Sequence, residues 1–367
     1  MSSPQPLSQI HGSLQELVKT IKLDVPPQRY IQEHREPTFV STSANSPLPS
    51  IPVIDMNDLM SILAGSDNMD HQLQNLRYVC HEWGIFQLVN HGVDKLLVEK
   101  MKEEVRKFFD MSVEEKLRYK LMAGDYQGYG QTILHTQDQK VDWADRFYMI
   151  TNPVHRRKSN LLPDFPPRLR DTMEKYLQEM QKLAMTLFGL MGQAVDIDKK
   201  EMIDVFDDGM QSIRMTYYPP CPQPDLVIGL TPHSDAAGIT ILLQVNDVEG
   251  LQVKKDGVWI PVSFLPDALI VNVGDILEIM SNGVYNSIEH RATVNETKER
   301  ISLAMFFNPK LEADVGPAKS LLRNTGDPPL YKTLVMEQYL KDFFSRKLNG
   351  KTFLEKMKIR YDEVGDA

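Results

Sequence analysis

Three side chains of this 367-residue chain have the types and spacing of ligands to one metal ion. His233 and Asp235 lie two residues apart in TPHSDAAGIT (231–240), so on an extended strand both point to one face. His290 lies in YNSIEHRATV, a second strand-like run, and can reach the same face from across a barrel. Two imidazoles and one carboxylate, with half of the coordination sphere open, are typical of non-haem Fe(II) sites that perform oxygen chemistry.

The H-x-D pair alone is weak, because it arises by chance and because zinc hydrolases also use it. The segment ERIS adds weight, since Arg300 and Ser302 are again two apart and share one face of a β-run. Arg300 can bind a carboxylate through two parallel hydrogen bonds, and Ser302 can add a hydroxyl donor. A structural arginine paired with an internal acid is the alternative, but the position ten residues after His290 favours a ligand.

RMTYYPPC (214–221) supplies a third row of polar side chains. Strand alternation places Arg214, Thr216 and Tyr218 on one face. Tyr218 can offer its phenol to the carboxylate that Arg300 binds. A tyrosine-rich strand that fills the core explains the same pattern.

The elements that must position these residues begin with strand patterns at 51–56 and 84–92, separated by a helical pattern. Helices are predicted for about 93–120 and from Pro167 onward, and the stretch 125–150 is expected to form a pair of loops that border a site. The stripe of the long helix is Met173, Tyr176, Leu177, Met180, Leu183, Ala184, Leu187 and Met191, which we interpret as core packing.

Residues 211–309 contain short β-rich runs between turn residues, and Asp256-Gly257 is typical of a two-residue hairpin turn. We therefore predict a mainly β fold with surrounding helices: a distorted double-stranded β-helix, or jelly roll, with an N-terminal α/β region and a C-terminal helix. The predicted regions are an N-terminal helix and arm (1–48), an N-terminal α/β region (49–165), a long packing helix (166–205), the jelly roll (206–310) and a C-terminal helical lid (311–367).

Composition excludes several classes of function. The formal net charge of -9 makes nucleic acid and anionic membrane surfaces poor partners, and no apolar run has the length of a membrane span. Cys80 and Cys221 are too few for a disulfide framework, and the first residues do not have the pattern of a signal peptide. We expect a cytoplasmic protein, and nothing in the sequence demands a dimer, so a monomer is expected.

The segments WGIFQLVNHG, YYPPCPQPDLVIGLTPHSD, GLQV, VNVGDILEIMSNG, HRA and ERIS occur in order from about Ile51 to the C-terminal helix. Together they resemble the plant 2-oxoglutarate- and Fe(II)-dependent dioxygenases, and within them the group of flavonol synthase, anthocyanidin synthase and the alkaloid O-demethylases. The resemblance implies a jelly roll with Fe(II) at one mouth, bound by His233, Asp235 and His290. It also implies that Arg300 and Ser302, assisted by Tyr218, bind the distal carboxylate of 2-oxoglutarate.

The chain departs from the family at Thr216, where much of the family has an asparagine that touches 2-oxoglutarate near the metal. A shorter hydroxyl can still donate a hydrogen bond. The family chemistry consumes O2 and decarboxylates 2-oxoglutarate to succinate while a substrate C–H bond is hydroxylated. At an O-methyl or N-methyl group the hydroxylated product loses formaldehyde. Ascorbate is expected to stimulate the reaction.

The substrate pocket is predicted from strand parity and from the aromatic loop region. The candidate residues are Phe306, Asn308, Ala304, Arg214, Tyr126, Tyr129, Ile133, Phe147, Phe343 and Phe344. Related flavonoid enzymes carry an acidic residue at the position of Asn308, so its absence argues mildly against a flavonoid. The predicted substrate is a small molecule, namely a bulky, mostly apolar secondary metabolite such as an alkaloid, a phenolic or a terpenoid.

Rival interpretations are an ascorbate-dependent, ethylene-forming type of oxidase and a gibberellin-type hormone oxidase. The first differs in its cosubstrate and the second only in its substrate. A jelly-roll module that binds a small ligand without catalysis is the alternative outside enzymes. The intact set of polar residues favours catalysis over that module, and a zinc hydrolase leaves Arg300 and Ser302 unexplained.

Overall fold

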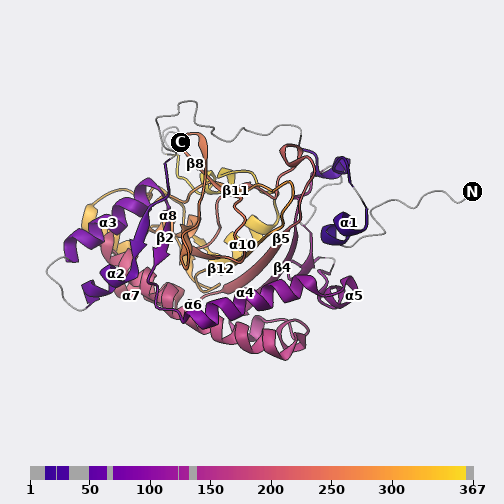
Figure 1. Ribbon diagram of the computed structural model, residues 1–367. Helices are drawn as coiled ribbons and strands as arrows, with labels where there is room; N and C mark the ends of the chain where they lie inside the picture. Colours follow the sequence, from indigo (N-terminus) through magenta and orange to yellow (C-terminus); the bar gives the residue numbers. More distant parts are fainter. Residues whose placement is uncertain are drawn as a thin grey trace, which may run out of the picture.

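The computed structural model describes residues 13–21, 23–32, 49–63, 69–122, 124–131 and 139–360. A curved β-structure occupies the centre, and helices cover its lower side and its left-hand end (Figure 1). This is the predicted mainly β fold with surrounding helices, and the jelly roll is confirmed. The boundaries of the five predicted regions stay a prediction.

The strands belong to three sheets in the described part of the chain. An eight-stranded sheet has the order β1-β2-β10-β7-β12-β5-β4-β3, and a four-stranded sheet has the order β6-β11-β8-β9. The strands are β1 (Val53–Asp55), β2 (Ile85–Val89), β3 (Gly128–Gly130), β4 (Asp145–Asn152), β5 (Gln211–Tyr218), β6 (Leu230–His233), β7 (Ile239–Gln244), β8 (Leu251–Lys255), β9 (Val258–Pro261), β10 (Leu269–Val273), β11 (His290–Ala292), β12 (Arg300–Phe307) and the small pair β13 (Asp314–Val315) and β14 (Leu334–Val335).

The helices lie before, between and after these strands. They are α1 (Leu14–Thr20), α2 (Met56–Leu63), α3 (Met69–Glu82), α4 (Lys95–Asp110), α5 (Val113–Lys116), α6 (Pro167–Ala194), α7 (Lys199–Phe206), α8 (Asp275–Met280), α9 (Lys319–Thr325), α10 (Met336–Phe344) and α11 (Thr352–Glu355). No helix in the described ranges is long and apolar enough to span a bilayer.

The largest core fills the space between the large sheet and the helices α4 and α6, which run side by side beneath it (Figure 1). Every member of the predicted α6 stripe is buried there, as its three- and four-residue spacing requires. The inward residues of β12 and β5, such as Leu303, Met305 and Met215, meet the same core. Because these residues alternate with Ser302 and Thr216, the opposite face of the same strands is left for the site.

Two predictions about the N-terminal half need correction. The stretch 125–150 is not simply a pair of loops, because it contributes β3 and β4 to the large sheet, where β4 pairs with β5 along most of its length. The strand predicted at 51–56 ends at Asp55, and α2 begins at Met56. Backbone pairing with β5 overrides the local composition in the first case, and the start of a helix does so in the second.

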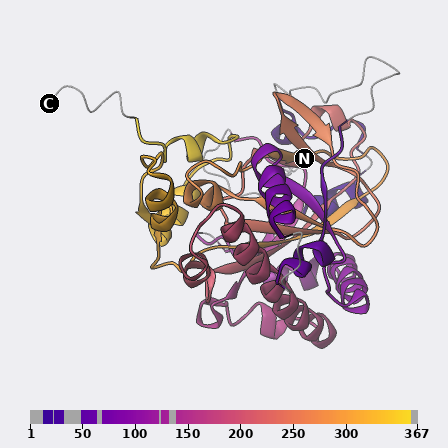
Figure 2. The ribbon, with the colours of Figure 1, turned by 90° about the vertical axis from the view of Figure 1, so that its left-hand side faces the viewer.

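The predicted hairpin is confirmed between β8 and β9. Asp256 and Gly257 both have positive φ, at 51° and 78°, which matches the twist of the flanking strands. In the C-terminal segment, α10 and α11 gather with α9 at the edge of the molecule (Figure 2).

Candidate metal centre and adjoining pockets

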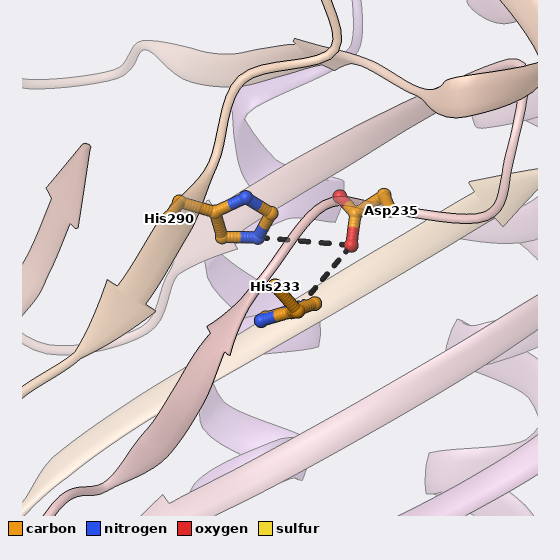
Figure 3. Close-up of side chains that lie close together, drawn as sticks. All are labelled: His233, Asp235 and His290. Carbon is orange, nitrogen blue, oxygen red and sulfur yellow. Dashed lines mark ion pairs between the residues drawn. The ribbon is translucent and has the colours of Figure 1, made fainter. Parts of the chain in front are cut away.

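His233 and His290 face each other on neighbouring strands. β6 and β11 are antiparallel partners with His233 opposite His290, so His290 is reached from the next strand and not from across a barrel. Asp235 lies two residues beyond His233, after β6 has ended, so a loop and not a continuous strand turns its carboxylate toward both rings. Figure 3 shows the three side chains pointing to one another.

The geometry leaves three acceptor atoms aimed at one point. Nδ1 of His233 lies 2.9 Å from the carbonyl oxygen of Thr231, and Nδ1 of His290 lies 3.1 Å from that of Ile288. These carbonyls can only accept, so they hold the proton on Nδ1 and leave a lone pair on each Nε2. The two Nε2 atoms lie 3.4 and 3.6 Å from Oδ1 of Asp235.

A cation resolves this arrangement. The buried Nε2 of His233 has no hydrogen-bond partner, and a neutral imidazole lone pair beside a carboxylate oxygen is repulsive unless a positive ion lies between them. The ligand atoms lie within 4.8 Å of one another, which suits one ion with three protein ligands. The donor set, two nitrogens and one oxygen, fits Fe(II) and leaves room for further ligands.

Electrostatics keep the donors in the binding-competent state. Burial opposes ionisation of Asp235, but the imidazoles of His290 and His233 and the Thr240 hydroxyl outweigh it and hold the pKa of Asp235 below its usual range. Burial lowers the pKa of His290 to about 4, so its Nε2 is unprotonated at neutral pH.

The remaining oxygen of Asp235 is held by the neighbouring strands. Thr240 Oγ1 donates to Asp235 Oδ2 at 2.7 Å, and Asn272 Nδ2 donates to it at 3.4 Å. Gly274 lets this loop approach β10 closely, because a Cβ there would lie 2.0 Å from the carbonyl oxygen of Ala237. Such partners orient a metal-binding carboxylate and raise its affinity for the ion.

A small cavity of about 30 Å³ leads from Asp235 and His290 to Arg300. Residues of both sheets line it, and among them are Tyr218, Ser302 and Ala304 from the predicted set. Thr216 lies opposite Ser302 in the register and is buried, but it is not one of the lining residues.

Arg300 is buried and poised for an anion. Its Nη2 donates to Gln244 Oε1 at 3.0 Å, its Nε has no partner, and it lies 5.1 Å from the ring centre of Tyr218. Gly250 makes room for it, since a Cβ there would lie 2.8 Å from Arg300 Cδ. Burial lowers the pKa of Arg300, so a bound carboxylate would stabilise the charged guanidinium.

Sequence reasoning missed Arg291 in this cavity. Its guanidinium lies 4.2 Å from the ring centre of Trp259, and its Nε donates to Gln252 Oε1 at 2.8 Å. The sequence offered no signal for it, because strand alternation assigns the residue directly after His290 to the opposite face.

A second, larger cavity of about 140 Å³ opens on the other side of His233 and Asp235. Six of the predicted pocket residues line it, namely Tyr126, Arg214, Phe306, Asn308, Phe343 and Phe344. The rings of Tyr126 and Phe344 stack at 5.1 Å with an angle of 7° between their planes. The helix α10 therefore covers one side of the cavity.

Four predicted pocket residues do not line this cavity, and one of them, Ala304, lines the smaller cavity. Phe147 packs in the core against Phe108 and Phe165. Tyr129 is buried, and its hydroxyl donates toward Ser13 Oγ at 3.0 Å and Asp145 Oδ2 at 3.2 Å. Ile133 lies outside the described residues.

The neighbours of Phe147 line the cavity instead. Arg146 and Tyr148 occupy the alternate positions of β4, and the prediction of loops over this stretch offered no strand parity by which to select them. The cavity also has lining residues outside the predicted set, among them Met210, Leu340, Arg346 and Lys347.

The fold and the site define a class: a jelly roll with a buried two-histidine, one-carboxylate centre between two cavities. Family models match on both halves of the chain. Residues 209–309 match the 2OG-Fe(II) oxygenase superfamily, and residues 51–167 match the non-haem dioxygenase in morphine synthesis N-terminal family.

Similar proteins cover nearly the whole chain. Oxoglutarate-dependent flavonoid 7-O-demethylase 1 of Ocimum basilicum is 47% identical over 95% of this chain and 91% of its own length. Codeine O-demethylase of Papaver somniferum is 46% identical over 95% of this chain and 96% of its own. A crystal structure of JOX2 in complex with 2OG, Fe and JA has a TM-score of 0.83 and 34% identity, and the match covers 95% of this chain and 98% of that one.

The chain belongs to the 2OG-Fe(II) oxygenase superfamily. It is a 2-oxoglutarate-dependent dioxygenase that uses Fe(II), which confirms the enzyme class and the cofactors predicted from the sequence. The non-catalytic module and the zinc hydrolase are thereby set aside.

Proposed function

We propose that His233, Asp235 and His290 bind the Fe(II), and that Arg300, Ser302 and Tyr218 bind the distal carboxylate of 2-oxoglutarate. The observation that carries this assignment is the small cavity, which joins two of the ligand residues, Asp235 and His290, to the unpaired Nε of buried Arg300. Residues of both sheets line this cavity, so rigid strands would hold the cosubstrate at both of its ends.

In the reaction, the residues of this chain bind, orient and exclude water. Nδ1–H of each histidine stays hydrogen-bonded to a backbone carbonyl, which keeps Nε2 free for the metal. Thr240 and Asn272 fix the carboxylate of Asp235. When bound, Fe(II) with 2-oxoglutarate and O2 supplies an oxidant able to attack a substrate C–H bond.

The substrate is proposed to be a bulky, mostly apolar secondary metabolite, such as an alkaloid, a phenolic or a terpenoid. The rings that line the larger cavity support a flat, ring-containing molecule; they are Tyr126, Tyr148, Phe306, Phe343 and Phe344. The metal ligands His233 and Asp235 line the same cavity, so a C–H bond of a bound molecule can face the centre.

Removal of an O-methyl or N-methyl group is one of the two proposed outcomes, beside simple hydroxylation. Relatives at 46–47% identity include a flavonoid 7-O-demethylase and a codeine O-demethylase, which supports demethylation. In that outcome oxygen is inserted into a methyl C–H bond, and the product loses formaldehyde. A gibberellin-type hormone oxidase would share the chemistry and differ in substrate.

The first test is an anaerobic titration of the purified protein with Fe(II) and then 2-oxoglutarate, followed by the weak visible charge-transfer band of the chelate. The band is expected in the wild type, absent in His233→Ala and weakened in Arg300→Ala. Iron binding without a band would point to the ascorbate-dependent oxidase or to a defect caused by Thr216. Thr216→Asn separates these two, because it restores the band only in the second case.

A screen of methoxylated aromatic compounds for formaldehyde release and succinate formation then tests demethylation. Succinate without formaldehyde indicates hydroxylation. Ascorbate is proposed as a stimulant that keeps the iron reduced, and omitting it should slow successive turnovers. We also propose a cytoplasmic monomer; the two buried free cysteines, Cys80 and Cys221, support a reducing compartment.

A further inference from the structure

The wall of the larger cavity is strongly cationic. Four of its lining residues carry a positive charge, namely Arg146, Arg214, Arg346 and Lys347. Among its lining residues the single carboxylate is Asp235, which the metal centre uses. The chain as a whole has a formal net charge of -9, so this concentration of positive charge runs against the overall composition.

Arg146 and Arg214 form a like-charged pair on adjacent strands. In the register of β4 and β5, Arg146 is opposite Thr216 and Tyr148 is opposite Arg214, so the two arginines are diagonal neighbours on one face. Both side chains are partly buried. Burial and the nearby charge of Arg214 lower the pKa of Arg146 to about 10, so the Arg146 guanidinium stays charged at neutral pH and is repelled by that of Arg214.

Neighbouring groups hold the two guanidiniums in place without neutralising them. Nε of Arg146 donates to the carbonyl oxygen of Gln131 at 3.3 Å, and the guanidinium of Arg214 lies 5.1 Å from the ring centre of Phe306. No carboxylate of the described residues forms an ion pair with either arginine. Asp142 is near enough to favour the charge of Arg146, but Oδ1 of Asp142 accepts hydrogen bonds from Thr231 N and Oγ1.

A partly buried like-charged pair costs free energy unless an anion joins it. Arginine forks suit a planar anionic oxygen group, and Phe306 beside them suits an aromatic ring. Hydration of the guanidiniums is the alternative, but it explains neither the pairing on one face nor the stacking of Arg214 over a ring that lines the cavity.

We propose that the substrate is an aromatic acid whose carboxylate binds between Arg146 and Arg214, with its ring against Phe306. This inference rests on the proposed function and narrows its substrate class. Arg214 lines both cavities, but Arg146 lines only the larger one and Arg300 only the smaller one. The carboxylate of the substrate is therefore distinct from that of 2-oxoglutarate.

The test compares 6-methoxy-2-naphthoate with its near-isosteric neutral amide, 6-methoxy-2-naphthamide. Dissociation constants are measured by calorimetry, without O2 and with saturating Fe(II) and 2-oxoglutarate, so that the cosubstrate site is filled. Wild type is expected to bind the acid at least about tenfold more tightly than the amide, because a charge-assisted bidentate contact is lost in the amide. A parallel titration with 2-oxoglutarate should give one site per chain.

Variants locate the effect. Arg146→Met should remove most of the preference for the acid, and Arg146→Lys should restore part of it. Lys347→Met is the matched control, since it removes one positive charge at an exposed position of the same cavity, and it should retain most of the preference. Raising the salt concentration in the wild type gives a readout that needs no variant and should weaken binding of the acid alone.

Equal binding of acid and amide, no binding of either, or an unchanged preference in Arg146→Met overturns the inference. A second 2-oxoglutarate per chain that Arg146→Met removes also overturns it, because the pair would then serve the cosubstrate. The chelate band, recorded in the same samples, distinguishes failure of the proposed function from failure of this inference. If the band forms and the acid is not preferred, the proposed function stands and this inference fails.

Discussion

The imidazole rings of His233 and His290 lie 4.3 Å apart between their centres, on residues that are direct partners in one antiparallel pair of strands. Their separation is therefore fixed by backbone hydrogen bonds, and only Asp235 depends on a loop. The carboxylate is the ligand that most needs outside support, and Thr240 and Asn272 provide it.

We expect Thr240→Val to weaken Fe(II) binding about tenfold, because the carboxylate of Asp235 loses its shortest hydrogen bond. Competition with a chromophoric chelator measures the affinity. Thr240→Ser retains the hydroxyl and should bind iron nearly as the wild type does. Equal loss in both variants would show that packing of the threonine methyl, and not the hydrogen bond, matters.

Arg300→Met should raise the dissociation constant of 2-oxoglutarate about 100-fold, because a buried charge-assisted contact is lost. Arg300→Lys should recover part of the affinity, since it keeps the charge without the fork. Titration of the chelate band gives the constants. Arg323→Met, which removes an exposed charge on α9, should leave them unchanged. If Arg300→Met binds normally, the cosubstrate is held elsewhere.

Phe344→Ala should uncouple the reaction, because the stack with Tyr126 that closes the larger cavity is lost. The ratio of succinate formed to substrate oxidised should rise, and substrate affinity should fall about tenfold. Phe344→Tyr keeps the ring and should remain coupled. An unchanged ratio in Phe344→Ala would mean that α10 does not shield the site from water.

Asp145→Ala should lower the free energy of unfolding by about 2–4 kcal/mol, because this buried carboxylate anchors the start of α1. Asp145 accepts hydrogen bonds from Ser13 Oγ at 2.6 Å, Leu14 N at 2.9 Å and Gln15 N at 2.8 Å. Urea unfolding measures the change, and Ser13→Ala should cost about 1 kcal/mol. Faster proteolysis near α1 is expected in both variants; unchanged stability would mean that α1 contributes nothing to the fold.

The stability of the metal-free protein should depend on the ionisation of Asp275. Burial, with a smaller contribution from nearby Glu278, raises the pKa of this carboxyl to about 7 from an ordinary value of 3.8. The folded chain thus holds a proton that the unfolded chain has released, so the free energy of unfolding falls as pH rises from about 4 to about 7.

Asp275→Asn mimics the protonated carboxyl and should flatten this slope. At pH 8 it should raise the free energy of unfolding by on the order of 2–4 kcal/mol. Unfolding curves across this pH range make the comparison. Asp204→Asn, at an exposed position on α7, is the control and should retain the wild-type slope. If Asp275→Asn has the same slope as the wild type, other groups cause the pH dependence.

The sequence by itself determined the features that depend on short-range periodicity. A spacing of two residues identified Arg300 and Ser302 as members of one strand face. Spacings of three and four residues identified α6, and the pair Asp256-Gly257 identified the β8–β9 turn. The three metal ligands could be predicted from the sequence, because few combinations of side chains bind a metal and leave half of its coordination positions open.

Only the tertiary structure decided which residues meet across the chain. Alternation says that Arg146 and Phe147 face opposite ways, but nearly all of β4 is buried, so hydrophobicity does not tell the cavity face from the core face. The pairing of β4 with β5 brings Arg146 beside Arg214, and the pairing of β6 with β11 brings His233 to His290. These contacts join segments far apart in the sequence, and their free energy comes from sheet pairing and burial that no local pattern records.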